Sequence, residues 1–499
     1  MLTPSRFLLL AGALAACAGH DDAHPELGSL AASGSHLLPA GYLSTRGSQI
    51  VDEHGTPVRL ACAGYVAPVD IEADLNGMVA AGFNCLRYPW FNGTMASDLA
   101  NVDAIVATAS RLGLKVILDH HGDEVPGPSN GWLPFPCNGL PFDQGDGTNG
   151  TDGCGDQGTV SRDRFVQDWV TFAGRYANNP TVIGVDLTNE PHLAPSFWAD
   201  NPGGATWADG AATDIRQIYS DAGKQIQAVN PGLLIICEGP FAFTGTLYDG
   251  QQTVIGGEAD LSLAASNPVT VDVPNKVVYS VHHYPSSIGG AGIDSGPTAI
   301  QSMNQSWGYL VSQRIAPVWV GELGASLDGA GPDSAGDKLA DEQAWAATLV
   351  DYLNGKDGDQ GGPTFSGDEQ GVGTDWWAWG YQPGQEPDGT IGDDGQLRPQ
   401  QYEVYSQLQY TASAGCEVSA DHATVTSAGP TLCDAAGNQW AIAGDGTMTE
   451  NGQNVLYSAN VIELAYVDGV IWQENASQLW WSFVDGGWAP ASGTPNAPL

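Results

Sequence analysis

Two glutamates stand at the ends of apolar runs that lie far apart in the chain. Glu190 directly follows the run Thr181–Asn189, and Glu322 lies near the end of the run Pro317–Leu323. Two carboxyl groups that face one glycosidic bond can cleave it, because one protonates the leaving oxygen as an acid while the other attacks the anomeric carbon. The spacing alone leaves open which glutamate has which role.

Arginine, asparagine, histidine and aromatic residues also occupy the ends of apolar runs. These residues are Arg87, His120, His121, Asn189, His282, His283, Tyr284, Trp376, Trp377 and Trp379. Neighbouring cations and hydrogen-bond donors set the protonation state of a carboxyl group, and indole rings offer an apolar platform. His120 and His283 alternate with their neighbours along strands, so we expect them to face elsewhere.

Each of these residues also has a structural interpretation. Each glutamate could instead belong to a structural ion pair with a Lys or Arg, which the scarcity of these bases disfavours. His121 and His282 could be core histidines with satisfied hydrogen bonds. Two His-His pairs and Asp119 would suit a metal-dependent hydrolase. Such an enzyme typically has His-x-His at its first strand, and the sequence has none there, so we predict no metal and no cofactor.

The elements that position these residues form a repeating pattern. Eight apolar runs predict strands, and they are Val58–Ala63, Phe83–Tyr88, Leu114–His120, Thr181–Asn189, Leu233–Glu238, Val277–Tyr284, Pro317–Leu323 and Thr374–Gly380. Near-continuous apolar runs are typical of parallel strands buried on both faces. Five amphipathic stretches predict helices, and they are Asn101–Leu112, Arg162–Asn178, Ala212–Val229, Met303–Ile315 and Asp341–Leu353. This alternation predicts a (β/α)8 TIM barrel, although the fifth and sixth strands have no good helix between them.

The texture of the sequence changes near Cys416, where short alternating runs and Gly-containing turns begin. We predict a barrel domain over 41–410 and a small Trp-rich all-β domain over 411–499 that ends in a Pro/Ala/Gly tail. Trp480 and Trp481 are adjacent, so on a strand they point to opposite faces. One can fill a core while the other binds polysaccharide, or the domain can be a structural cap or spacer.

Composition excludes two classes of partner. The 499 residues include 16 Lys+Arg and 57 Asp+Glu, which gives a net charge of −41. Such a chain repels nucleic acid and anionic membrane surfaces. The 16 Trp and 16 Tyr supply apolar area for large cores, so the chain is not an acidic disordered tail.

The N-terminus predicts export. Residues 1–19 combine Arg6 with an apolar run that is too short to span a bilayer, and 20–40 reads as a tether. Residues 14–17 (LAAC) resemble a bacterial lipobox, which would place a lipid anchor at Cys17. Ordinary cleavage after a small-x-small site is the alternative. The protein is therefore expected to be extracellular, or at the outer membrane or cell surface if Cys17 is lipidated, with no transmembrane span.

Export permits disulfides. Cys137 and Cys154 bracket a Gly-rich loop, and Cys416 and Cys433 bracket another, so each pair is a plausible bridge. Cys62 and Cys85 sit in consecutive predicted strands and could pair or remain buried thiols. Cys237 lies in an apolar run and is expected to be a buried free thiol.

Four blocks resemble glycoside hydrolase family 5, the cellulase family of retaining (β/α)8 enzymes, and especially its bacterial endo-β-1,4-glucanases. The blocks are 179–192 (NPTVIGVDLTNEPH), 278–284 (VYSVHHY), 316–324 (APVWVGELG) and 377–379 (WAW). The likeness covers about 41–409. It implies that the partner is a polysaccharide, a β-glucan, cleaved by double displacement.

The resemblance also implies a role for each site residue. Glu190 would be the acid/base and Glu322 the nucleophile, held by Arg87 and Tyr284. Further roles fall to Asn189 (sugar 2-hydroxyl), to His121 and His282 (lining of the subsite) and to Trp377 (sugar platform).

Two departures from the family pattern concern the substrate. The first strand ends Cys62-Ala63-Gly64-Tyr65, where relatives usually carry an Asn-aromatic step, and the loop 122–159 has no recognised counterpart. A β-mannanase, another β-glucanase or a non-catalytic carbohydrate-binding barrel therefore remain alternatives.

Overall fold

A computed structural model describes two compact units, Met1–Tyr410 and Thr411–Leu499. Within them the structure describes residues 36–66, 68, 70–122, 160–191, 205–211, 213–242, 258–285, 287, 295–328, 339–380, 389–391, 396–410, 418–426, 431–434, 438–444, 446–450, 453–455, 458–484 and 487–498. The predicted export signal and tether, and most of the loop 122–159, lie outside these residues. Among the described helices, none combines the length and hydropathy of a transmembrane segment.

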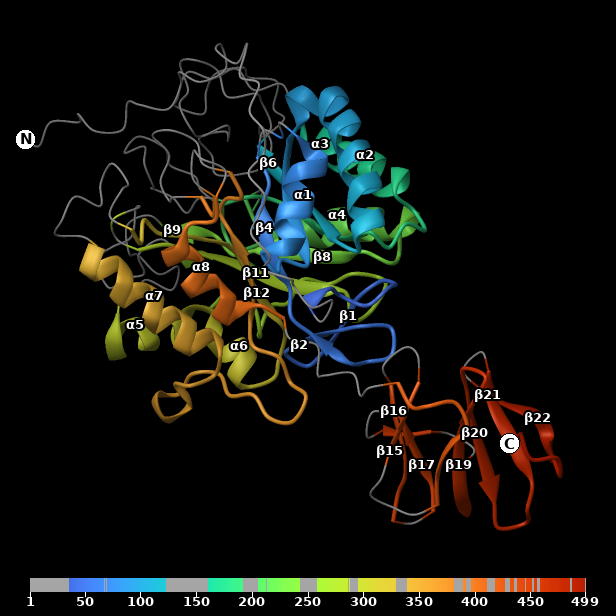
Figure 1. Cartoon of the computed structure of the whole chain (residues 1–499). Helices are drawn as coiled ribbons and strands as arrows, with labels where there is room; N and C mark the ends of the chain where they lie inside the picture. Colours follow the sequence, from blue (N-terminus) through green and yellow to red (C-terminus); the bar gives the residue numbers. More distant parts are fainter. Residues whose placement is uncertain are drawn as a thin grey trace, which may run out of the picture. The chain divides into compact units, whose positions relative to one another are not determined.

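The first unit is built on a closed barrel of eight parallel strands (Figure 1). Around the barrel they are β4 (Ala61–Gly64), β5 (Cys85–Phe91), β6 (Lys115–Gly122), β7 (Val182–Asp186), β8 (Leu234–Glu238), β11 (Val277–His283), β12 (Val318–Leu323) and β13 (Gly373–Trp376). The predicted (β/α)8 barrel is confirmed, and each predicted strand overlaps one of these eight. Because all eight are parallel, their carboxyl ends meet at one mouth, where a TIM barrel places its site.

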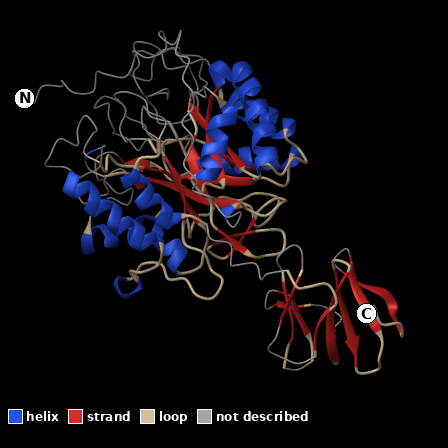
Figure 2. Cartoon of the chain, viewed as in Figure 1, coloured by secondary structure: helices blue, strands red, loops and turns tan. Residues whose placement is uncertain are grey.

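Helices flank the barrel strands, which Figure 2 shows in red. They are α1 (Ile71–Ala80), α2 (Met95–Leu112), α3 (Arg162–Arg175), α4 (Ile215–Val229), α5 (Gly296–Met303), α6 (Tyr309–Ser312), α7 (Leu339–Leu353) and α8 (Pro399–Tyr405). The predicted helix Met303–Ile315 is instead the end of α5, a π turn at Asn304–Gly308 and α6. A Cβ atom at Gly308 would collide with the hydroxyl of Tyr352, so glycine is required at this close approach.

The link between the fifth and sixth barrel strands departs from the βα repeat, as expected. Its described parts, 239–242 and 258–276, contain a short antiparallel pair, β9 (Phe241–Ala242) and β10 (Glu258–Ala259), and no helix. At the start of the barrel unit, β1 (Ser44–Arg46), β2 (Gln49–Val51) and β3 (Pro57–Val58) form a small antiparallel sheet.

Large aromatic side chains fill the space between strands and helices. Trp90, Trp207 and Trp307 are at most 2% exposed, so they belong to the core. Trp319 and Trp345 are buried too.

The structure shows the state of four of the cysteines. Cys62 and Cys85 stand opposite each other on β4 and β5 with their Cα atoms 4.4 Å apart, and they form a disulfide. Cys237 is a buried free thiol, as predicted. Cys433 is disulfide-bonded, while its predicted partner Cys416, like Cys137 and Cys154, lies outside the described residues.

The second unit is all-β, as predicted, and contains two antiparallel sheets (Figure 2). The larger sheet is β14 (Ala423–Val425), β19 (Val461–Val467), β20 (Val470–Asn475), β21 (Trp480–Val484) and β22 (Gly487–Thr494). The smaller one is β15 (Thr431–Cys433), β16 (Gln439–Ile442), β17 (Met448–Glu450) and β18 (Gln453–Asn454). A core that includes Trp440 and Leu464 draws on both sheets. Asp468 and Gly469 connect β19 to β20, and both have the positive φ of a tight hairpin turn.

Candidate active site

Arg87, on β5, is the centre of the charge network at the barrel mouth. Its side chain is fully buried and donates hydrogen bonds to Glu322 Oε1 (2.7 Å), Asn189 Oδ1 (2.7 Å) and Asp186 Oδ2 (2.9 Å). Its Nη2 also lies 3.0 Å from Asp119 Oδ1. Burial alone would lower the pKa of Arg87, but the surrounding carboxylates raise it well above its usual value. One guanidinium thus ties together residues from four barrel strands and their ends.

Glu322, on β12, is held at both of its carboxyl oxygens. Arg87 donates to Oε1, and the Tyr284 hydroxyl donates to Oε2 at 2.7 Å. The residue is 5% exposed. Donors at both oxygens fix the orientation of the carboxylate, and a carboxylate held in one orientation can act as a nucleophile.

Glu190 lies beyond the end of β7 in a different environment. Its side chain is 16% exposed, and its Oε1 lies 2.9 Å from His282 Nδ1. Burial raises its pKa to about 7, against the opposing charges of His121 and Arg87. The raised pKa lets Glu190 hold its proton at a higher pH than a solvated glutamate does, as a general acid requires.

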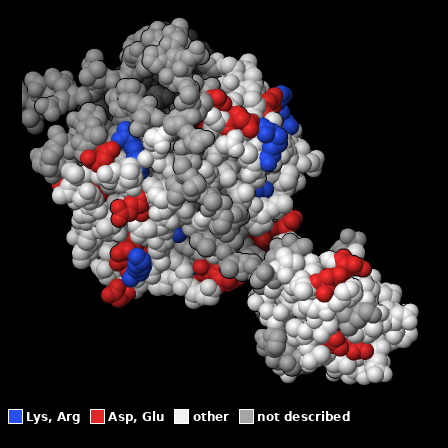
Figure 3. All heavy atoms as spheres, viewed as in Figure 1, with Lys and Arg blue, Asp and Glu red and all other residues white. Residues whose placement is uncertain are grey.

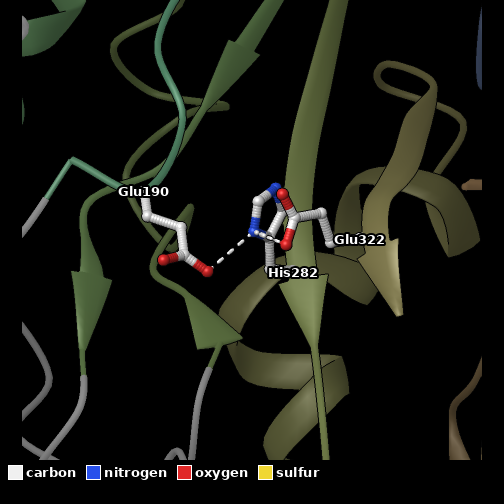
Figure 4. Close-up of side chains that lie close together, drawn as sticks. All are labelled: Glu190, His282 and Glu322. Carbon is white, nitrogen blue, oxygen red and sulfur yellow. Dashed lines mark hydrogen bonds and ion pairs between the residues drawn. The ribbon is translucent and has the colours of Figure 1, made fainter. Parts of the chain in front are cut away.

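His282, on β11, lies between the two glutamates (Figure 4). Its Nδ1 is 2.9 Å from Glu190 Oε1 and 3.6 Å from Glu322 Oε2. This nitrogen and one oxygen of each glutamate lie within 4.8 Å of one another. Burial lowers the pKa of His282 to about 3, so the imidazole is neutral.

Asn189, His121 and Trp377 complete the predicted set. The Asn189 amide oxygen accepts from Arg87, which leaves its NH2 group for another acceptor. His121 Nδ1 lies 2.6 Å from Asp119 Oδ2, and its ring stacks on Trp377 with centroids 5.2 Å apart and planes 5° apart. The structure thus gathers all eight predicted site residues at the same end of the barrel.

Comparison with known proteins agrees with this geometry. The family Cellulase (glycosyl hydrolase family 5) matches residues 51–383, about two thirds of the chain. The chain belongs to this cellulase family. It is a glycosyl hydrolase.

Relatives of this cellulase come from several organisms. An endoglucanase of Paenibacillus polymyxa is 30% identical over 70% of this chain and 87% of its own length. The major extracellular endoglucanase of Xanthomonas campestris pv. campestris is 25% identical over 73% of this chain and 71% of its own. An endocellulase from Pyrococcus horikoshii has a similar fold, with a TM-score of 0.55 and 21% identity over 74% of this chain and 98% of the other.

The cellulase also contains buried acids that the sequence analysis did not place in the site. They are Asp119, considered only as a metal ligand, and Asp186, Glu238 and Asp375. All four side chains are fully buried. Burial raises the pKa of Asp119 and of Asp186 to about 7. It raises the pKa of Glu238 and of Asp375 well above the usual value of a carboxyl group. A single acid within an apolar run was the available signal, as in 182–187 (VIGVDL).

The two remaining histidines of the His-His pairs face away from this site, as predicted. His120 Nε2 lies 2.6 Å from Asn92 Oδ1, and its ring packs against Trp90. His283 Nδ1 accepts a hydrogen bond from the indole N–H of Trp345 at 2.9 Å. Both rings therefore pack in the layer between barrel and helices.

Proposed function

We propose that this cellulase is an endo-β-1,4-glucanase that cleaves cellulose-like chains with retention of configuration. One observation carries the proposal: an oxygen of Glu190 and an oxygen of Glu322 lie within 4.8 Å of each other, in opposite environments. Carboxyl groups about 5–5.5 Å apart suit a retaining enzyme, whereas an inverting one needs about 6.5–9.5 Å to admit a water molecule.

The reaction proceeds in two displacements. Glu322 attacks the anomeric carbon while Glu190 gives its proton to the leaving glycosidic oxygen, so a glycosyl ester forms and the first product departs. Glu190, now a carboxylate, takes a proton from water, and the resulting oxygen nucleophile displaces Glu322 from the sugar. Asn189 directs its free NH2 group to the 2-hydroxyl, and Trp377 provides the apolar platform beneath the ring.

The relatives support the choice of substrate. The proteins from Paenibacillus polymyxa and Xanthomonas campestris are named endoglucanases, and the Pyrococcus horikoshii protein is an endocellulase that was crystallised with cellotetraose. The Xanthomonas protein is described as extracellular, which supports export of this chain as well. Lipidation at Cys17 and simple signal cleavage both remain predictions.

A substrate panel tests the proposed function. On soluble β-1,4-glucan the protein is expected to lower viscosity faster than it releases reducing ends, because internal cuts shorten chains early. Faster turnover of β-mannan or mixed-linkage glucan would show that β-1,4-glucan is not the preferred substrate. A folded protein that binds glucan without cleaving it would support the binding-barrel alternative.

A chelator experiment tests whether a metal takes part. The question arises because Glu190, His282 and Glu322 are ligand types that could hold a metal ion. Double displacement by two carboxyl groups needs no metal. Dialysis against a strong chelator is therefore expected to leave the rate unchanged. Activity that is lost and then restored only by zinc or manganese would revive the metallohydrolase interpretation.

We further propose that the C-terminal unit binds polysaccharide on the face of its larger sheet that lies away from the sandwich core. Trp472 and Trp480 pack there over Ala465 and Val467, in a cluster separate from the sandwich core. Trp472 is only partly buried. Glu463 and Glu474 stand directly opposite each other on neighbouring strands of this face. Like charges that face each other destabilise a sheet. We therefore propose that Glu463 and Glu474 serve binding and accept hydrogen bonds from sugar hydroxyls.

Charge narrows the ligand to a neutral one. Residues 411–499 contain no Lys or Arg, and the side of the unit seen in Figure 3 shows acidic patches only. An anionic polysaccharide or phosphate surface would be repelled, whereas cellulose carries hydroxyl groups and no charge. This favours the same class of polymer as the barrel substrate.

Trp472→Ala in the full chain is expected to weaken adsorption to insoluble cellulose by about three- to tenfold, since one ring contact is lost. Every sample contains a saturating concentration of a soluble cello-oligosaccharide, so that the barrel site does not contribute to adsorption. Trp481→Ala is the matched control, because Trp481 lies opposite Gln473 and thus on the other face. Equal adsorption of both variants and the wild type would favour a structural spacer.

A further inference from the structure

Glu238, at the end of β8, contacts the candidate acid/base residue and is itself closed off from solvent. It is fully buried, and its Oε2 accepts a hydrogen bond from the backbone N–H of Glu190 at 2.7 Å. The same oxygen lies 3.5 Å from Nε2 of His282, which is an electrostatic contact rather than a formed hydrogen bond. Glu238 therefore reaches Glu190 by two routes, through its backbone and through the imidazole that contacts its carboxyl group.

The first route concerns the backbone conformation of Glu190. This residue has a φ of 44°, in the left-handed region that is unfavourable for a non-glycine residue. A conformation of this kind persists only where surrounding contacts hold it. The Glu238 carboxyl is such a contact, because it fixes the N–H that emerges from the strained residue.

The second route concerns the tautomer of His282. Its neutral imidazole has one N–H, and which nitrogen carries it depends on the partner of the other. Burial raises the pKa of Glu238 well above its usual value, which favours the protonated form of this carboxyl. A hydroxyl oxygen at the Oε2 position can accept from Glu190 N–H and direct its own hydrogen toward Nε2. The imidazole hydrogen then lies on Nδ1 and faces Glu190 Oε1.

We propose that Glu238 is a positioning residue for the acid/base step, which holds the backbone of Glu190 and keeps the N–H of His282 on the nitrogen that faces the Glu190 carboxyl. An N–H donor at this place stabilises the Glu190 carboxylate that forms when the leaving group takes its proton. The inference rests on the acid/base role proposed above for Glu190.

The charged and titratable groups around Glu238 come from several elements. Glu190 and Asp186 approach from β7 and its end, Arg87 from β5, His282 from β11 and Tyr219 from α4. Tyr219 donates its hydroxyl hydrogen to the backbone carbonyl of Glu238 at 2.9 Å, so it holds the strand rather than the carboxyl group. Of these groups, His282 contacts both the Glu238 carboxyl and the Glu190 carboxyl.

Glu238→Gln separates the two routes. Its amide oxygen can still accept from Glu190 N–H, but it offers no hydrogen at that position, so Nε2 of His282 takes the imidazole hydrogen and Nδ1 turns a lone pair toward Glu190. Loss of this donor raises the pKa of Glu190. The basic limb of the pH profile of kcat/KM is therefore expected to move up by about one unit.

Glu238→Ala removes both routes and is expected to lower kcat/KM about 100-fold through misplacement of Glu190. Glu342→Gln, a buried glutamate of α7, is the matched control and should leave the profile in place. An unshifted basic limb in a folded Glu238→Gln protein would overturn the inference. If instead Glu190→Ala keeps the basic limb, the proposed role of Glu190 fails first.

A measurement on the unmodified protein makes the test independent of folding of the variants. In the full chain labelled with ¹⁵N-histidine, His282 is expected to show the tautomer with hydrogen on Nδ1 at neutral pH. A resonance of the Nε2–H tautomer would contradict the inference even if every variant at position 238 failed to fold.

Discussion

Glu322→Gln is expected to lower kcat/KM on soluble β-1,4-glucan by at least about 10⁴-fold, the largest effect of any single substitution in the site. The amide has nearly the size of the carboxylate, and its oxygen can still accept from Arg87. It is not a nucleophile, however, so the covalent step is lost while the fold is retained. Initial rates on purified protein with an unchanged circular dichroism spectrum measure the effect.

The stereochemistry of the wild-type reaction checks the same assignment independently. Proton NMR of the first-formed product should show the anomer that matches the substrate, because two displacements restore the configuration. Glu403→Gln, at an exposed position of α8, is the matched control and should retain wild-type rates. An inverted product, or a Glu322→Gln protein of near-normal rate, would remove Glu322 from the role of nucleophile.

The barrel could be predicted because its strands are buried on both faces, which leaves a clear apolar signature. Runs such as 233–238 (LLIICE) have few other interpretations. Helix bounds are harder to predict from sequence, because packing decides where a helix ends and whether it is regular. The interruption at Asn304–Gly308 depends on the approach of Gly308 to Tyr352 from another helix, which local sequence does not encode. The sequence pattern does not predict helix α1, because only Leu75, Gly77 and Met78 are buried along it and they form no extended apolar face.

The site residues that line the cleft could be predicted from one rule, that the ends of parallel strands converge. The residues behind them could not. Asp186 and Glu238 each interrupt an apolar run, and sequence alone does not distinguish a buried partner of Arg87 or Glu190 from a solvated acid at a strand end. Likewise the Cys62–Cys85 pairing became certain only from the register of β4 and β5.

Glu190→Ala is expected to lower kcat/KM on polysaccharide by about 10²–10⁴-fold, the range in which general acid catalysis contributes. Without the acid, the glycosidic oxygen must depart unprotonated. The loss should therefore be much smaller for an aryl β-glycoside of a strongly acidic phenol, whose leaving group needs no proton. On that substrate the second step becomes limiting, because the base that activates water is missing too, and a burst of phenol should precede a slow steady state.

The pH profile adds a check that only the acid/base residue can satisfy. Burial raises the pKa of Glu190 to about 7, so the protonated enzyme becomes tenfold scarcer with each pH unit above this value, and kcat/KM of the wild type should fall along a basic limb near pH 7. Glu190→Ala should lose this limb, whereas Glu322→Gln should keep it in its residual activity if any is measurable. A Glu190→Ala protein with equal losses on both substrates and an intact limb would mean that another group supplies the proton. The fully buried Glu238, 2.7 Å from the Glu190 backbone nitrogen, would then be the next candidate only if His282 relayed that proton to the cleft.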